Sequence, residues 1–172
     1  MNKTNRINLV AAAVSAALMG VTFMGTPASA EPQQECNVTN YGGECRWDSP
    51  ARGAETHGEF NVPDGVTSVE FEVLGATTGC RFYENEPLPR CAAGDSVKGS
   101  MEVKPGDRFD VTARTGLPFN DGSSDLTVSG AAQPLVHAAG GGSHSSSYGP
   151  EGAAVEKRDS HSPGSGTVII RW

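Results

Sequence analysis

Strict alternation of apolar and polar residues is the feature that most constrains this chain. In Val69–Val73 the valines and the phenylalanine fall on one face of an extended chain, and the glutamates fall on the other. This period of two is typical of a half-buried strand. Similar alternation recurs over residues 97–104 and 108–114, and the chain ends on an apolar strand pattern over 167–172. These segments predict a β-sheet protein whose sheets each bury one face.

Glycine content and the lack of helical patterns point the same way. The chain has 22 glycines, which disfavour long helices, and no segment after residue 30 combines a helical period with caps. Pro63-Asp64-Gly65 and Pro105-Gly106-Asp107 are turn signals, and we expect the second to join two antiparallel neighbours. The prediction is all-β: a single antiparallel β-sandwich or jelly-roll-like domain with long loops, above all over 77–96 and 140–165.

Residues 1–30 have the composition of a bacterial signal peptide. Two basic residues precede an alanine-rich apolar run over 9–24, and Ala28-Ser29-Ala30 has the small-x-small form of a signal-peptidase site. A membrane anchor is the alternative, but the run is short and is interrupted by a serine and a glycine. We therefore predict cleavage before Glu31 and a secreted mature chain with no membrane insertion.

The mature chain is the length of one domain. Residues 31–56 are polar, with few apolar side chains, and we read them as a disulfide-pinned arm or edge hairpin. Residues 57–172 form the predicted β-sandwich domain. Whether the arm packs on that domain is left open by the sequence.

Charge excludes some partners. The protein has 13 basic and 20 acidic residues, and two of the basic ones but none of the acidic ones lie in the signal segment, so the mature chain carries a net charge of −9. Such a surface argues against nucleic acid and anionic lipid as electrostatic partners. It would tolerate cationic partners.

Four cysteines in an exported chain indicate two disulfides. They allow three pairings, of which we favour the local ones, Cys36–Cys45 and Cys80–Cys91. A structural metal is the alternative, but neither CxxC spacing nor a paired histidine spacing occurs. We predict no metal and no cofactor.

Four segments, taken in order, resemble one family. They are Phe60–Ala76, Gly99–Asp107, Pro134–Ser143 and Gly166–Trp172. Together they resemble secreted bacterial glycine-rich domains, distantly similar to the glycine-rich extracellular region of the anaplastic lymphoma kinase receptors. The resemblance covers about residues 58–172 and implies an extracellular binding or structural role. The family's long glycine tracts are absent here, since a predicted disulfide loop over 77–91 stands where one would follow Gly-Ala.

The stretch His137–Ser147, HAAGGGSHSSS, invites a chemical reading. It lacks the GxSxG elbow of many serine hydrolases and the GxxxxGK[ST] pattern of a phosphate loop. We read its glycines as a close backbone crossing, followed by a polar loop.

Asn120–Asp125 offers oxygen ligands but fits a hairpin turn better than a calcium loop. His57, His144 and His161 fall in expected loops at no metal-ligand spacing.

The Cys80–Cys91 loop is the predicted recognition surface. It carries Phe82, Tyr83, Leu88 and Arg90, our candidate ligand-binding residues. Alternatively, its aromatic residues cover an edge of the sandwich.

We expect an exported, non-enzymatic module that binds an extracellular glycan or protein, or a component of the cell envelope. The alternative is a cell-surface structural protein that self-associates through edge strands, and a secreted hydrolase or a small protease inhibitor built on residues 87–90 is less favoured.

Overall fold

The computed structural model describes residues 33–39, 42–50, 55–116, 122–159 and 164–172. Within them it has strands in antiparallel sheets and no helix, which confirms the all-β prediction. Accordingly, no helix among these residues could span a membrane. The predicted signal peptide, the start of the predicted 120–125 turn and His161 lie outside the described residues.

The larger sheet has six strands in the order β1-β2-β12-β4-β7-β11. Its strands, all antiparallel to their neighbours, are β1 (Gln33–Thr39), β2 (Gly42–Asp48), β12 (Thr167–Arg171), β4 (Ser68–Leu74), β7 (Asp95–Glu102) and β11 (Ala154–Lys157). The C-terminal strand β12 therefore sits in the middle of the sheet. It pairs with β2 of the N-terminal hairpin on one side and with β4 on the other.

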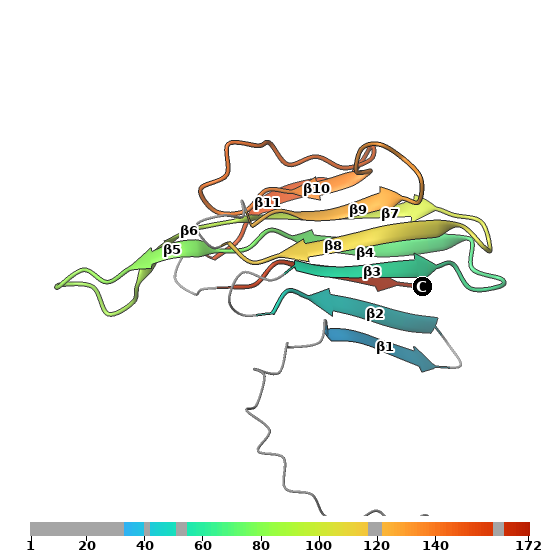
Figure 1. The fold of residues 1–172 in the computed structure, drawn as a ribbon, viewed down its shortest axis with the longest axis horizontal. Coiled ribbons are helices and arrows are strands. Elements are labelled where there is room, and N and C mark those ends of the chain that lie inside the picture. Colours follow the sequence, from blue (N-terminus) through green and yellow to red (C-terminus); the bar gives the residue numbers. More distant parts are fainter. Residues whose placement is uncertain (1–32, 40–41, 51–54, 117–121, 160–163) are drawn as a thin grey trace, which may run out of the picture.

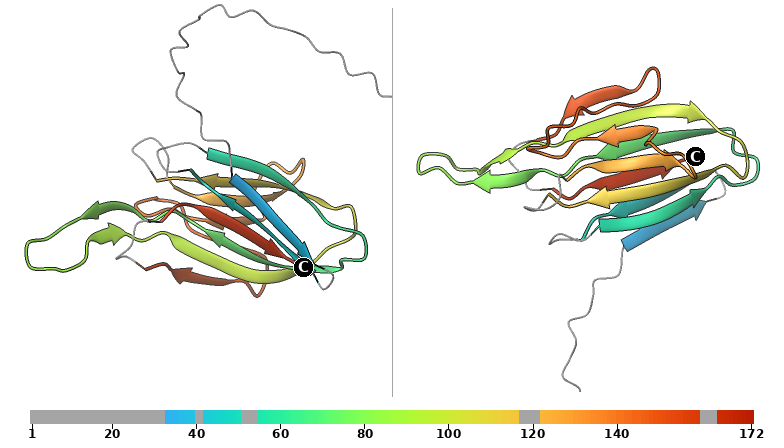
Figure 2. Two further views of the ribbon diagram at one scale, coloured as in Figure 1. Left: turned by 90° about the horizontal axis from the view of Figure 1, so that it is seen from below. Right: turned by 45° about the horizontal axis from the view of Figure 1, so that its top comes forward.

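The smaller sheet has four antiparallel strands in the order β10-β9-β8-β3. They are β10 (Val136–Ala138), β9 (Ser124–Val128), β8 (Arg108–Arg114) and β3 (Glu55–Asn61). The two sheets lie against each other as the layers of a sandwich (Figure 1). A separate two-stranded sheet of β5 (Thr78–Arg81) and β6 (Arg90–Ala92) extends beyond the end of the sandwich (Figures 1 and 2).

The core follows the alternation seen in the sequence. In β4 the side chains of Val69, Phe71 and Val73 are buried, while Glu70 on the opposite face is exposed. Alternate residues of β8 are buried in the same way. Each sheet thus contributes one apolar face to a shared core, as the period of two predicts.

The segment expected as a disulfide-pinned arm or edge hairpin forms the β1–β2 hairpin at one edge of the larger sheet. Strand β1 is an edge strand, but β2 pairs with β12 from Asp48 to Glu44. Trp47 on β2 is fully buried and packs edge-on against Phe60, with ring centroids 6.5 Å apart. A side chain at Gly58 would collide with the Trp47 indole, so glycine there makes room for it.

Two details differ from the prediction. The Pro105-Gly106-Asp107 turn does not join neighbouring strands, because β7 belongs to the larger sheet and β8 to the smaller one. The turn therefore carries the chain from one layer to the other. The expected long loops over 77–96 and 140–165 contain β5, β6 and β11, which lie at the periphery and are mostly exposed.

We predict that Trp47→Ala lowers the free energy of unfolding by about 3–5 kcal/mol, the usual cost of deleting a large buried aromatic side chain. Chemical denaturation followed by circular dichroism measures this. Val38→Ala on the exposed edge strand β1 is the control, expected within about 0.5 kcal/mol of the original protein. A Trp47→Ala loss below about 1 kcal/mol would show that β2 is not part of the core.

Candidate functional site

The β5–β6 hairpin and its turn, residues 78–92, project beyond both sheets (Figure 2). We call this projection the finger. It leaves the sandwich after β4 and returns into β7, two adjacent strands of the larger sheet. The base of the finger is therefore attached to two adjacent strands inside the larger sheet, whereas its tip lies away from the sandwich.

The tip of the finger exposes large apolar side chains. Phe82 is 81% exposed, Tyr83 51% and Leu88 53%. These three are among only seven exposed large apolar side chains in the part of the chain that the structure describes. Their exposure means that they do not cover an edge of the sandwich, which was the alternative reading of this loop. Clustered apolar residues in water are typical of a binding surface.

Arg90, the fourth predicted site residue, lies at the start of β6. Its guanidinium contacts both carboxylate oxygens of Glu86, at 2.5 and 2.7 Å, and its Cζ atom lies 6.0 Å from the centre of the Tyr83 ring. These contacts tie the turn to the strand and orient the Tyr83 ring. They also argue against a protease inhibitor that would present Arg90 as a free cation.

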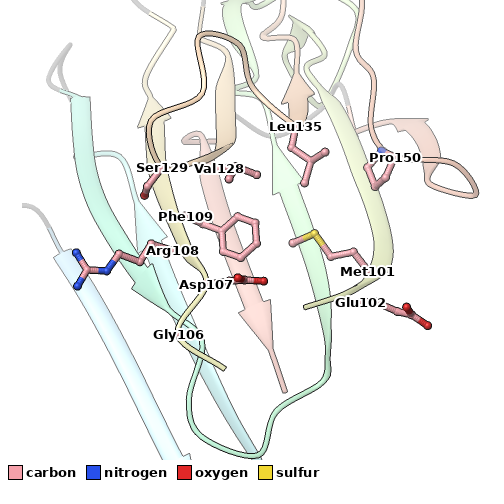
Figure 3. Close-up of a pocket in the computed structure, with 10 residues that line it drawn as sticks. All are labelled: Met101, Glu102, Gly106, Asp107, Arg108, Phe109, Val128, Ser129, Leu135 and Pro150. Atoms are coloured by element: carbon pink, nitrogen blue, oxygen red, sulfur yellow. The ribbon is translucent and has the colours of Figure 1, made fainter. Parts of the chain in front are cut away.

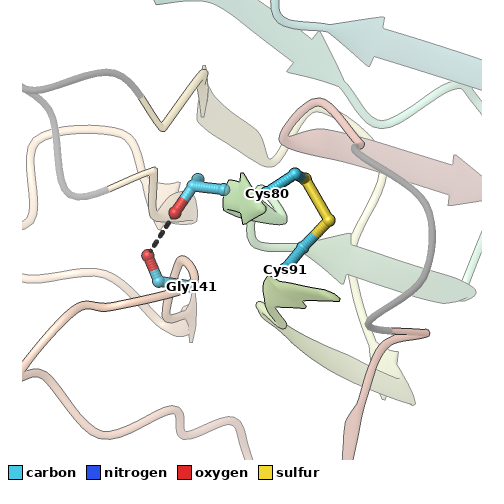
Figure 4. Close-up of a disulfide and its surroundings, with 4 residues drawn as sticks. Cys80, Cys91 and Gly141 are labelled. Carbon is cyan, nitrogen blue, oxygen red and sulfur yellow. Dashed lines mark hydrogen bonds between the residues drawn. A yellow bond between two sulfur atoms is a disulfide. The ribbon is translucent and has the colours of Figure 1, made fainter. Parts of the chain in front are cut away.

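Both disulfides have the local pairing that the sequence favoured, Cys36–Cys45 and Cys80–Cys91. The second bridges β5 and β6 at the finger (Figure 4). Its two cysteines are 11 positions apart in the sequence, and such a crosslink stabilises the folded loop by roughly 2–3 kcal/mol on the chain-entropy model. Two disulfides indicate that the protein matures in an oxidising compartment.

The glycines of HAAGGGSHSSS hold the root of the finger. Gly141 donates its N–H to Ala76 O at 2.7 Å and accepts from Thr78 Oγ1 at 2.6 Å. A Cβ atom at Gly141 would collide with the carbonyl oxygen of Ala92, so only glycine lets the backbones approach this closely. This agrees with the structural reading of the oligoglycine run.

A chain of polar contacts starts in the same stretch. The register of β9 and β10 places His137 directly opposite Asp125, and His137 Nδ1 lies 2.6 Å from Asp125 Oδ1. On the other side of the ring, His137 Nε2 lies 3.1 Å from Ser145 Oγ. Asp125, expected in a hairpin turn, is in β9 instead. The sequence places His137 in a motif with serines, but its pairing with Asp125 and Ser145 depends on strand register and loop path, which the sequence does not show.

Arg114 neutralises the carboxylate of Asp125. Its Nη1 atom lies 2.6 Å from Asp125 Oδ2, and its Nε atom lies 3.1 Å from Glu55 Oε1. Burial raises the pKa of Asp125, but hydrogen bonds from His137 and Arg114 outweigh burial, so its pKa lies below the ordinary value. The Asp125 carboxylate is therefore ionised at neutral pH although only 11% of its side chain is exposed.

The polar loop after the glycines is tied to the sandwich. His137 and Tyr148 exchange two backbone hydrogen bonds, of 2.9 and 3.0 Å, and their rings stack with centroids 5.5 Å apart. Ser147 Oγ accepts from the Ala139 N–H at 2.8 Å and donates to Asp95 Oδ2 at 2.5 Å. These contacts hold Ser145 over the edge of β10.

A recess of about 570 Å³ opens at the turn between β7 and β8, at the far end of β7 from the finger (Figure 3). Met101, Phe109, Val128 and Leu135 contribute apolar lining, and Asp107 lies beside the Phe109 ring. Phe109 belongs to the core, and Met101 and Leu135 pack against it. Because these side chains already serve the core, we place the candidate site on the finger.

The described histidines do not gather as metal ligands. His57, expected in a loop, lies in β3 and contacts Glu55 and Thr112. Within the described ranges, no group of three histidine, cysteine, aspartate or glutamate side chains could hold a metal ion.

Comparison with known proteins adds no relative. No family model matches the chain, and neither a curated protein nor a solved structure is similar to it.

We predict that Gly141→Ala costs about 3 kcal/mol of unfolding free energy, because the Ala92 backbone must move to admit a methyl group. Gly142→Ala is the matched control. Gly142 has a φ of +81° but no neighbour within 4 Å of the added carbon, so only backbone strain of roughly 1–2 kcal/mol is expected. Denaturant unfolding gives both values, and NMR shifts of the Thr78 and Ala92 amides report the root. Equal losses without shift changes would contradict the close crossing.

Proposed function

We propose that the protein is an exported binding module whose finger contacts an extracellular glycan or protein. The observation that carries the proposal is the exposure of Phe82, Tyr83 and Leu88 at the tip of a projecting hairpin. Aromatic side chains with few rotatable bonds supply large contact area at a small entropic cost, and they dominate many binding interfaces. The polar Glu86–Arg90 pair beside them would form the rim of such a surface.

The finger is also restrained before any partner arrives. Its disulfide fixes the two strands, the Arg90–Glu86 contact fixes the turn, and Gly141 fixes the root. Restraint in the free protein lowers the entropy lost on binding, which strengthens affinity without new contacts. An oxidising compartment and the resemblance to secreted glycine-rich domains support the extracellular setting of this proposal.

We predict that Phe82→Ser combined with Leu88→Ser weakens binding by at least tenfold, since truncated interface anchors typically cost 1–2 kcal/mol or more each. Purified oxidised protein is incubated with cell-envelope fractions and secreted polysaccharide of the source organism, and the bound share is measured. A Cys80→Ser, Cys91→Ser variant tests the contribution of restraint and should bind more weakly than the original protein.

Val38→Ser is the matched control, because Val38 is equally apolar and 68% exposed but lies on β1, outside the finger. It should bind as the original protein does. Equal binding by the finger variant and the original would place recognition elsewhere. Binding to none of the fractions would remove the envelope and polysaccharide partners.

Self-association is the second candidate, and the edges of the larger sheet favour it. Strand β11 is exposed along its whole length, with Val155 49% exposed, and β1 on the opposite edge exposes Val38. Unpaired edge strands can add a strand from another copy. If β1 of one copy pairs with β11 of the next, the sedimentation coefficient rises with protein concentration. A constant monomer value across micromolar to millimolar concentrations would eliminate this candidate.

A further inference from the structure

Three side chains are connected in the way that a serine nucleophile, its histidine base and the supporting carboxylate are connected in a catalytic triad. Ser145 Oγ lies 3.1 Å from His137 Nε2, and His137 Nδ1 lies 2.6 Å from Asp125 Oδ1. A hydroxyl, an imidazole and a carboxylate in this connectivity are recognised by geometry and role, because such triads occur on unrelated folds and in different chain orders. The absence of a GxSxG elbow therefore does not exclude a catalytic triad at this position.

The histidine is positioned as a base requires. Asp125 on one ring nitrogen favours the tautomer that carries its proton on Nδ1, which leaves Nε2 free to accept from Ser145. Arg114 holds the second oxygen of Asp125 at 2.6 Å, so the carboxylate cannot swing away from the ring. The Tyr148 ring stacks on His137, whose side chain is only 13% exposed. The imidazole is thus held by Asp125 at Nδ1, by Ser145 at Nε2 and by the Tyr148 ring on one face.

The nucleophile itself is accessible. Ser145 is exposed, and its hydroxyl lies 2.6 Å from Ser143 Oγ. A base within hydrogen-bond reach on a fixed scaffold is the arrangement that activates a serine. The other exposed serine of this loop, Ser146, has no such contact with the ring and serves as an internal comparison.

We propose that Ser145 is an activated nucleophile that accepts the acyl group of a carboxylic ester, with His137 as its general base and Asp125 as a positioning residue. The Ser145 Oγ–H proton moves to His137 Nε2 as the Oγ–C bond forms. The ester C–O bond then breaks, and the leaving alcohol takes that proton from His137. Water releases the acid by the same two steps, which restores the serine. Because the protein is acidic, a neutral or cationic ester fits better than an anionic one.

The test uses the full oxidised protein with two probes, a fluorophosphonate and p-nitrophenyl acetate. We expect one phosphonyl group per molecule, located on Ser145 by peptide mass spectrometry, and ester hydrolysis above the rate in buffer. Ser145→Ala should abolish the adduct, and His137→Gln should slow labelling by at least about 100-fold, the range of general-base contributions. Ser146→Ala should label normally.

Asp125→Asn tests the positioning role, and its readout is the pH dependence of the labelling rate. It should slow labelling and change the profile, whereas a merely structural residue would change stability alone. Thermal unfolding of every variant separates lost fold from lost reactivity. A folded original protein that carries no adduct on Ser145, or His137→Gln labelled at the original rate, would overturn the proposal. The finger proposal is independent, since Phe82→Ser with Leu88→Ser should label at the original rate.

Discussion

Close backbone contacts at the root of the finger are the constraint on which both candidate sites depend. Added Cβ atoms on Gly75, Gly94 and Gly141 would collide with the carbonyl oxygens of Ala139, Gly75 and Ala92 respectively. At this junction the ends of β4 and β7, the segment after β10 and the finger meet within backbone contact distance. Side chains of any size would separate the strands there. Because these glycines have no side chain, four backbone segments can pack against one another at this junction. A larger residue at any of the three positions would force them apart.

How far the sequence predicts the fold depends on which faces of a strand are buried. Strands β4 and β8 bury one face each, so alternation in the sequence reveals both. Alternation does not say which sheet a strand joins, because both sheets bury one face alike; this is why the turn at Pro105-Gly106-Asp107 was wrongly expected to join neighbours. Strand β11 is exposed on both faces, so no apolar pattern marks it.

The two candidate sites differ in the same way. The closed Cys80–Cys91 loop could be predicted because cysteine spacing is a local feature, and the disulfide confirms it. The exposure of its aromatic residues could not, because the sequence also allowed them to cover an edge of the sandwich. The contact between Asp125 and His137 depends on the register of β9 and β10, and the longer connection over 129–135 does not fix that register in the sequence. Ser145 reaches His137 only because the backbone of Tyr148 returns to pair with it. Sequence patterns do not determine the register between strands that are joined by long connections, so these contacts could not be predicted.

The finger and the Ser145 site share one short segment of chain, and this bears on what they could do together. Gly141 lies at the finger root, and Ser145 follows four residues later, so chain geometry keeps the two within about 14 Å. The exposed apolar residues of the finger lie at its tip, away from this root, so a partner must extend from the tip back to the sandwich to bring an ester bond close to the hydroxyl. Such tethering raises the effective concentration of a reacting group by orders of magnitude. An exposed serine in this arrangement would react fastest with esters carried by such a bound partner, so binding at the finger would set the selectivity of the serine.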